Sequence, residues 1–181
     1  NISGVKIGAI SSNKIIESTS KFLDKFTKIP VVIDPIIEAG GGGRFMKKQN
    51  INFSLKKLYP QATLLTPNLN ELKILSGCKT EKDSISSLLD LGIKNIFVTG
   101  KSRKNEVIST LFINGIKELD VKTKKISKTF HGSGCALSTS ILCNFIKTKD
   151  LKKSCLNANE FMRKILKNSI KTKNQDFINF S

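Results

Sequence analysis

The amino-acid sequence predicts an α/β domain built on a mostly parallel sheet. Short runs of apolar, often β-branched residues alternate along the chain with segments of helical periodicity. Two of these runs stop at Pro35 and Pro67, because proline cannot donate a ladder hydrogen bond inside a sheet. The length of 181 residues suits one domain. Ligands bind beyond the carboxyl ends of the strands in such sheets, so the residues that follow the strands are the first candidates for a site.

The first half of the chain alternates strand and helix signals. Strands are expected at residues 5–10, 31–33 and 63–66. Helices are expected at residues 14–26, 53–59, 69–75 and 84–91. Gly77 suits the C-terminus of the third helix, and Thr80 with Asp83 resembles a capping box before the fourth. The glycines at 40–43 are expected to form a flexible loop, because no helix starts on them.

The second half begins with a strand at residues 96–99 and continues with a hairpin. Asn114-Gly115, between β segments at 107–113 and 116–121, is the strongest short hairpin signal in the chain. Helices at residues 134–146 and 151–170 complete the domain, with no internal repeat.

The formal net charge is +17, but its distribution argues against a nucleic-acid partner. The chain has 28 Lys and only 3 Arg, spread along its length, and no Trp and 1 Tyr for base stacking. A solvated, lysine-rich surface explains this composition, and a basic nucleic-acid-binding module is the alternative. No run approaches the roughly 18 apolar residues needed to span a bilayer, which argues against a membrane protein.

The cysteines point to a reducing compartment. None forms a Cys-x-x-Cys pair and His131 is the only histidine, which argues against a Cys/His zinc site. No signal peptide is evident, so free thiols in the cytoplasm are expected. The four cysteines are Cys78, Cys135, Cys143 and Cys155.

A glycine turn, Gly132-Ser133-Gly134, directly precedes a predicted helix. Glycine lets the backbone approach a ligand closely, and the unpaired N–H groups at a helix N-terminus favour an anion such as phosphate. Cys135 follows in the first helical turn, where the pKa of a thiol can be lowered. The alternative is a simple tight turn with Cys135 as a small buried residue.

Two carboxylates lie near the ends of predicted strands. Asp34 and Glu71 could hold Mg²⁺ through oxygen, or they could be caps or surface residues. Gly100-Lys101-Ser102 is not a P-loop, because Asn95 stands where the motif requires glycine. His131 suits a structural hydrogen bond better than a catalytic role, since no partner carboxylate is in view.

The order of these motifs resembles the hydroxymethylpyrimidine/phosphomethylpyrimidine kinases of thiamine biosynthesis, which belong to the ribokinase-like superfamily. The resemblance covers essentially the whole chain. The segments that carry it are Val31-Val32-Ile33-Asp34-Pro35, Leu65-Thr66-Pro67-Asn68-Leu69-Asn70-Glu71, Ile96-Phe97-Val98-Thr99-Gly100 and His131-Gly132-Ser133-Gly134-Cys135. It implies a three-layer α/β/α fold, with residues 1–181 forming one kinase domain that lacks its first strand region.

The resemblance also implies roles for individual residues. Gly132, Ser133 and Gly134 would form the anion hole for the transferring phosphoryl group, and Cys135 would activate the substrate hydroxyl as a thiolate base or by positioning it. The remaining assignments are ATP binding by Asn68, Glu71, Thr99, Gly100 and Lys101, Mg²⁺ binding by Asp34 and Glu71, and substrate binding by Gly8, Ala9 and Ile36. ATP, Mg²⁺ and an aminopyrimidine alcohol or its phosphate are the implied ligands.

Several features depart from the family. Thr99-Gly100-Lys101-Ser102 replaces the Lys-Gly-Gly-His of many members, and Ala9 stands where they usually have Met. The chain begins at Asn1 almost directly on a strand, so an N-terminal truncation is expected. A pyridoxal-type kinase and a non-catalytic fragment are the alternative functions, and a homodimer is possible for the family.

Overall fold

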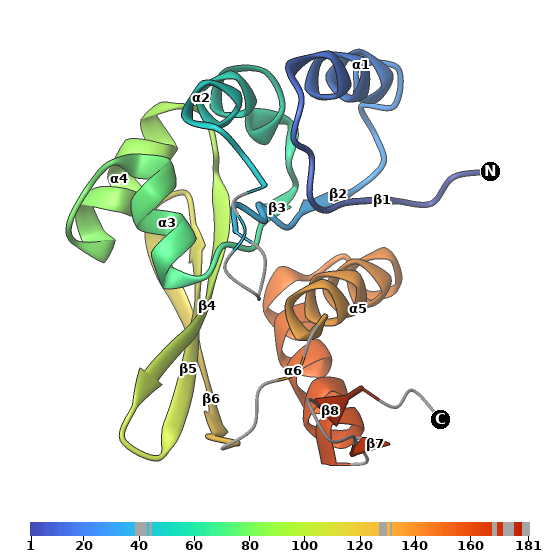
Figure 1. Cartoon of the computed structure of the whole chain (residues 1–181). Helices are drawn as coiled ribbons and strands as arrows, with labels where there is room; N and C mark the ends of the chain where they lie inside the picture. The colour runs from blue at the N-terminus through green and yellow to red at the C-terminus, as the bar shows by residue number, and fades with distance from the viewer. Residues whose placement is uncertain are drawn as a thin grey trace.

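The computed structural model describes residues 1–38, 43, 45–126, 130, 132–167, 170–171 and 176–178. Its main sheet has 6 strands in the order β1-β2-β3-β4-β5-β6. The first four strands run parallel, and β5 and β6 add an antiparallel hairpin at one edge (Figure 1). The strands are β1 (Val5–Ile7), β2 (Val31–Ile33), β3 (Leu64–Leu65), β4 (Asn95–Arg103), β5 (Glu106–Ile113) and β6 (Ile116–Lys124). The predicted α/β class with a mostly parallel sheet is confirmed.

Helices cover both faces of the sheet and make it the middle of three layers. Figure 1 shows α5 and α6 on the side of β1–β3 opposite to α1 and α2, while α3 and α4 flank β4. The helices are α1 (Asn13–Leu23), α2 (Lys48–Lys57), α3 (Leu69–Ser76), α4 (Glu81–Asp90), α5 (Ser133–Thr148) and α6 (Leu151–Lys167), with a short 3₁₀ turn η1 (Tyr59–Gln61). A separate hairpin pairs β7 (Ile170–Lys171) with β8 (Asp176–Phe177).

Strand residues alternate between two hydrophobic cores. Val31 and Ile33 of β2 pack into the core under α1–α4, whereas Val32 between them packs against α5 and α6. In the same way Ile96 of β4 faces the first core and Phe97 faces the second. Successive side chains of a strand point to opposite faces, so a strand covered on both sides is apolar throughout. This explains why the sequence shows continuous apolar runs.

Most element boundaries differ from the expected ones by a few residues, as four elements show. The first strand ends at Ile7, not at residue 10, and α2 starts at Lys48 on a polar stretch without apolar periodicity. Strand β4 continues through polar residues to Arg103, because β5 pairs with it that far. The last helix ends at Lys167, and Ile170 pairs with Phe177 in β7–β8. The glycine loop at 40–43 lies outside the described residues except for Gly43.

The predicted hairpin turn is confirmed by its backbone. Asn114 and Gly115 both have positive φ, 49° and 78°, as a two-residue turn of type I′ requires.

In the described part of the chain, no helix is both long and apolar enough to cross a bilayer.

Gly115→Ala is expected to destabilise the protein by about 1–2 kcal/mol, because the added Cβ is strained at positive φ and also meets Leu89. An ideal Cβ at Gly115 would lie 2.9 Å from Leu89 Cδ2. Gly77→Ala is the matched control, since Gly77 has φ 71° but nothing lies within 4 Å of its ideal Cβ. Urea unfolding measures both variants, and an equal or smaller loss at Gly115 would contradict the role of the Leu89 contact.

Candidate active site

The glycine turn begins α5 and leaves its first N–H groups without a side-chain cap. Gly132 is the N-cap residue with φ 81°, a left-handed conformation that favours glycine, and its carbonyl accepts the first helical hydrogen bond from Ala136 N–H at 2.9 Å. The Ser133 hydroxyl donates to the Phe130 carbonyl at 3.2 Å, which fixes the start of the turn. The uncapped N–H groups and the helix dipole suit an anion. His131 lies outside the described residues.

Asp34, which directly follows β2, lies close to this glycine turn. Its side chain is buried, and its Oδ2 accepts a hydrogen bond from the Ser138 hydroxyl of α5 at 3.4 Å. An ideal Cβ at Gly134 would lie 3.9 Å from the same oxygen, so the helix backbone approaches the carboxylate closely. Burial raises the pKa of Asp34, and nearby Lys6 opposes this shift. The structure therefore brings together two elements that are about a hundred residues apart in sequence.

Cys135 directly follows Gly134, whose ideal Cβ would lie 3.9 Å from Asp34 Oδ2, and this placement corrects the expected acidity of the thiol. Burial and the negative charge of Asp34 raise the pKa of Cys135, whereas the sequence suggested that the helix N-terminus lowers it. The desolvation of a half-buried thiol and an adjacent carboxylate outweigh the helix dipole. Cys135 is therefore a neutral thiol at neutral pH.

Lys6 is a member of this cluster that the sequence reasoning missed. Its Nζ lies 3.7 Å from Asp34 Oδ2, and its positive charge lowers the pKa of both Asp34 and Cys135. Val5 and Ile7 pack in or against the core under α1, so Lys6 between them points to the opposite face, where α5 lies. A lysine inside an apolar strand of a sheet buried on both faces was the available signal.

The three predicted substrate-binding residues follow β1 and β2. An ideal Cβ at Gly8 would lie 3.0 Å from Lys6 Nζ and 3.8 Å from Ile36 Cδ1, so Gly8 and Ile36 both adjoin the cluster. Ala9 is exposed. The structure thus places an apolar side chain and open backbone beside the charged groups.

Asn68 and Glu71 form the N-terminal cap of α3. The Asn68 amide oxygen accepts from Glu71 N–H at 2.9 Å, and Glu71 Oε2 accepts from Asn68 N–H at 2.8 Å, a reciprocal capping box. Burial raises the pKa of Glu71 to about 7, and the charges of Asp34 and Glu38 add to this shift. Among the described residues no group of three or more metal-ligating side chains occurs.

Thr99, Gly100 and Lys101 lie where β4 passes α3. Thr99 forms a parallel bridge with Asn68, and its N–H donates to the Pro67 carbonyl at 2.9 Å. Gly100 has φ 73° within an irregularity of the β4–β5 pairing. Lys101 Nζ lies 3.0 Å from a carboxylate oxygen of Glu81 and also donates to Thr110. The ammonium group of Lys101 is therefore held by these two side chains.

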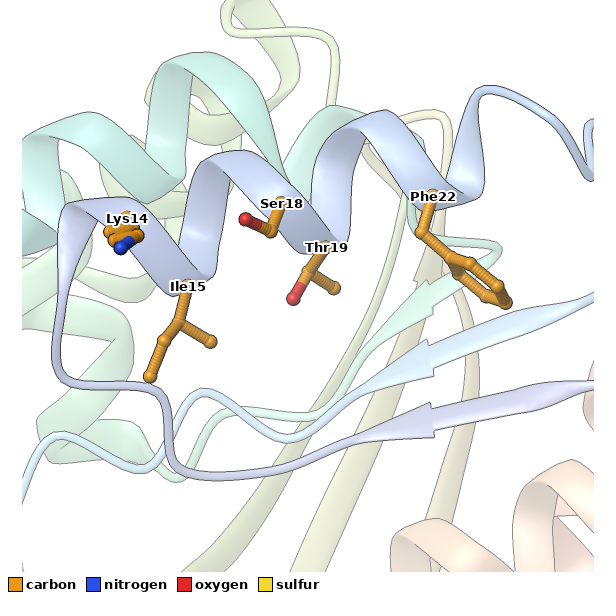
Figure 2. Close-up of a pocket in the computed structure, with 5 residues that line it drawn as sticks. All are labelled: Lys14, Ile15, Ser18, Thr19 and Phe22. Atoms are coloured by element: carbon orange, nitrogen blue, oxygen red, sulfur yellow. The ribbon is translucent and has the colours of Figure 1, made fainter.

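An open hollow along α1 is separate from this cluster. Figure 2 shows Ile15, Thr19 and Phe22 extending from α1 toward the side on which β1 lies. The lining residues are Lys14, Ile15, Ser18, Thr19 and Phe22. None of them belongs to the cluster around Asp34 and Cys135.

Comparisons with known proteins show the family of the chain and similarity to pyridoxal kinases. Residues 1–178 match the family model described as phosphomethylpyrimidine kinase. The hydroxymethylpyrimidine/phosphomethylpyrimidine kinases of Aquifex aeolicus and Helicobacter pylori are 29% and 30% identical to the chain, each over 94% of it, and the match covers 69% and 66% of those proteins. A Bacillus subtilis pyridoxal kinase solved as an ADP complex superimposes with a TM-score of 0.85 at 25% identity, over 99% of this chain and 70% of that one. The chain thus spans about two thirds of these relatives.

Proposed function

The chain belongs to the phosphomethylpyrimidine kinase family, and from this premise we propose that it transfers the γ-phosphoryl group of ATP to an aminopyrimidine. The acceptor is the hydroxymethyl group of 4-amino-5-hydroxymethyl-2-methylpyrimidine or the phosphate of its monophosphate, as thiamine diphosphate biosynthesis requires. The observation that carries the proposal is the approach of Asp34 to the uncapped N-terminus of α5, where its Oδ2 accepts from Ser138 and would lie 3.9 Å from an ideal Cβ at Gly134. Phosphoryl transfer depends mainly on positioning and on electrostatic stabilisation, which such a site supplies.

The proposed step uses each group of this cluster. The substrate hydroxyl oxygen attacks the γ-phosphorus, the bond to the leaving ADP oxygen breaks, and the hydroxyl proton passes to the Asp34 carboxylate. The Cys135 thiol, neutral because its pKa is raised, orients the hydroxyl and the carboxylate toward each other. The N–H groups after Gly132 donate hydrogen bonds to the phosphoryl oxygens and so stabilise their negative charge.

Glu71, with the nearby charge of Asp34, suits a Mg²⁺ ion that is carried mainly by phosphate oxygens. Both side chains are buried, and the charge of Asp34 contributes to raising the pKa of Glu71, so a divalent cation would relieve repulsion between them. Kinase sites typically hold Mg²⁺ through one or two carboxylates together with substrate phosphates. The ion would supply neutralisation of phosphate charge.

A coupled ADP-release assay with 4-amino-5-hydroxymethyl-2-methylpyrimidine, its monophosphate and pyridoxal tests the proposal. Turnover on the pyrimidine alcohol or its monophosphate is expected. Turnover on pyridoxal alone would replace the proposed substrate, and no turnover on any acceptor would contradict the kinase activity.

A pyridoxal kinase is the second candidate function. Its support is the similarity of the fold to the Bacillus subtilis pyridoxal kinase, with a sequence identity of 25%. Ring-binding residues decide between the two acceptors, and the same assay compares them directly.

A further inference from the structure

We propose that Lys6 is a catalytic residue of this site, whose ammonium group contacts the transferred phosphoryl group opposite the N–H groups of α5. The proposal rests on the proposed phosphoryl transfer. The family resemblance implies an anion site made of glycine backbone, a thiol and carboxylates. Lys6 adds a positive side chain to that site.

The sheet directs Lys6 toward the N-terminus of α5. Lys6 is paired with Val32 in the parallel register of β1 and β2, and Val32 packs in the core under α5 and α6. Paired residues on neighbouring strands share one face of the sheet. The side chain of Lys6 therefore starts on the α5 face and ends with its Nζ 3.7 Å from Asp34 Oδ2, the oxygen that would lie 3.9 Å from an ideal Cβ at Gly134 of the glycine turn.

Gly8 leaves room for the ammonium group of Lys6, because it has no side chain. An ideal Cβ at Gly8 would lie 3.0 Å from Lys6 Nζ, a contact tighter than nearly all real Cβ contacts. The lysine side chain thus extends along the strand over a residue that has no side chain. Only 20% of its side-chain surface is exposed, which is low for lysine, so its charge is directed into the site and is weakly screened by water.

The described contacts leave the charge of Lys6 only partly compensated. Its 3.7 Å separation from Asp34 is longer than the 3.0 Å between Lys101 and Glu81, and a close ion pair has a distance of roughly 2.7–2.9 Å. A lysine ammonium group carries several N–H donors, and a phosphoryl oxygen is a strong acceptor for them. Lys101, which the family resemblance suggested for the nucleotide, is in contact with Glu81 and Thr110.

A purely structural role would make Lys6 a positioning residue that acts through Asp34. Removing Lys6 would then lower the rate only while Asp34 is present. Direct contact with the phosphoryl group predicts a cost that is independent of Asp34. A double-mutant cycle separates these two cases, because coupling through one shared partner appears as non-additivity.

Lys6→Met is expected to lower kcat about 100-fold, as the loss of one transition-state donor typically does, while the KM for ATP changes less than about 3-fold. Lys6→Met should have the same cost in an Asp34→Asn background. Lys21→Met, at an exposed lysine on α1, is the matched control and should leave kcat unchanged. No further loss in the Asp34→Asn background, or an unchanged kcat for Lys6→Met alone, would overturn the proposal.

A readout without turnover keeps this test separate from that of the kinase activity. Alkylation of Cys135 by iodoacetamide is followed by peptide mass mapping with and without inorganic phosphate. Phosphate bound at the glycine turn is expected to slow alkylation at least 5-fold in the wild type and in Lys21→Met, but not in Lys6→Met. Persistent protection in Lys6→Met, or no protection in the wild type, would overturn the role of Lys6. Lys6-dependent protection in a protein without turnover would support it while the proposed function fails.

Discussion

Replacing Cys135 with alanine is expected to lower turnover by about 10²–10⁴-fold, with little change in ATP affinity. The thiol lies near enough to Asp34 for the charge of that carboxylate to contribute to raising the pKa of Cys135, and it stands in the first turn of α5 beside the glycines of the anion site. Alanine removes the group that orients the substrate hydroxyl toward the carboxylate but leaves the backbone N–H groups in place. The loss should therefore appear in kcat, and nucleotide binding measured by calorimetry should be retained.

Two further variants sharpen this test. Cys135→Ser keeps a hydroxyl that can donate to Asp34, so partial activity is expected if the neutral thiol positions the reacting groups. A thiolate base predicts that serine is as inactive as alanine. Cys143→Ala removes an exposed free thiol from the same helix and is the matched control. Full turnover by Cys135→Ala would remove Cys135 from the mechanism.

The fold was predictable because local signals and tertiary packing agree. Asn114-Gly115 needs positive φ at both residues, and Gly77 ends α3 in a left-handed conformation, as each does in the structure. The apolar run at residues 31–33 identified a strand covered on both faces. Where tertiary pairing alone decides the structure, as in the polar end of β4 or at Ile170, the local signal was absent or misleading.

The site was predictable as a set of motifs, but its electrostatics was not. Motif order named Asp34, Glu71 and Cys135, and the structure brings Cys135 against Asp34. Its position in a first helical turn predicted that Cys135 is more acidic than an ordinary thiol. That prediction was wrong, because the position says nothing about burial or about a carboxylate from another strand. Lys6 was missed for the same reason, since only the register of β1 on β2 shows which face it occupies.

Glu71 is expected to make the free energy of unfolding fall as pH rises from about 4.5 to 8. The carboxyl is 8% exposed, and its pKa is raised from 4.5 to about 7, mainly by burial and also by Asp34 and Glu38. The folded state therefore keeps a proton that the unfolded chain releases in this window, so stability is greatest at low pH and is lost as pH rises through the folded pKa. A shift of this size corresponds to about 3 kcal/mol.

Comparing wild type with Glu71→Gln isolates this contribution. Glutamine keeps an acceptor for the Asn68 N–H but carries no charge, so its stability should not change through this group. The wild type should lose about 3 kcal/mol relative to Glu71→Gln between pH 4.5 and 8 in urea unfolding. Glu160→Gln, at an exposed glutamate of α6, is the control and should follow the wild type. Parallel pH profiles for wild type and Glu71→Gln would show that the Glu71 carboxyl is not destabilised by burial. With Mg²⁺ and ATP present, the wild type is expected to be stabilised more than Glu71→Gln, because only the carboxylate can contribute charge to a bound cation.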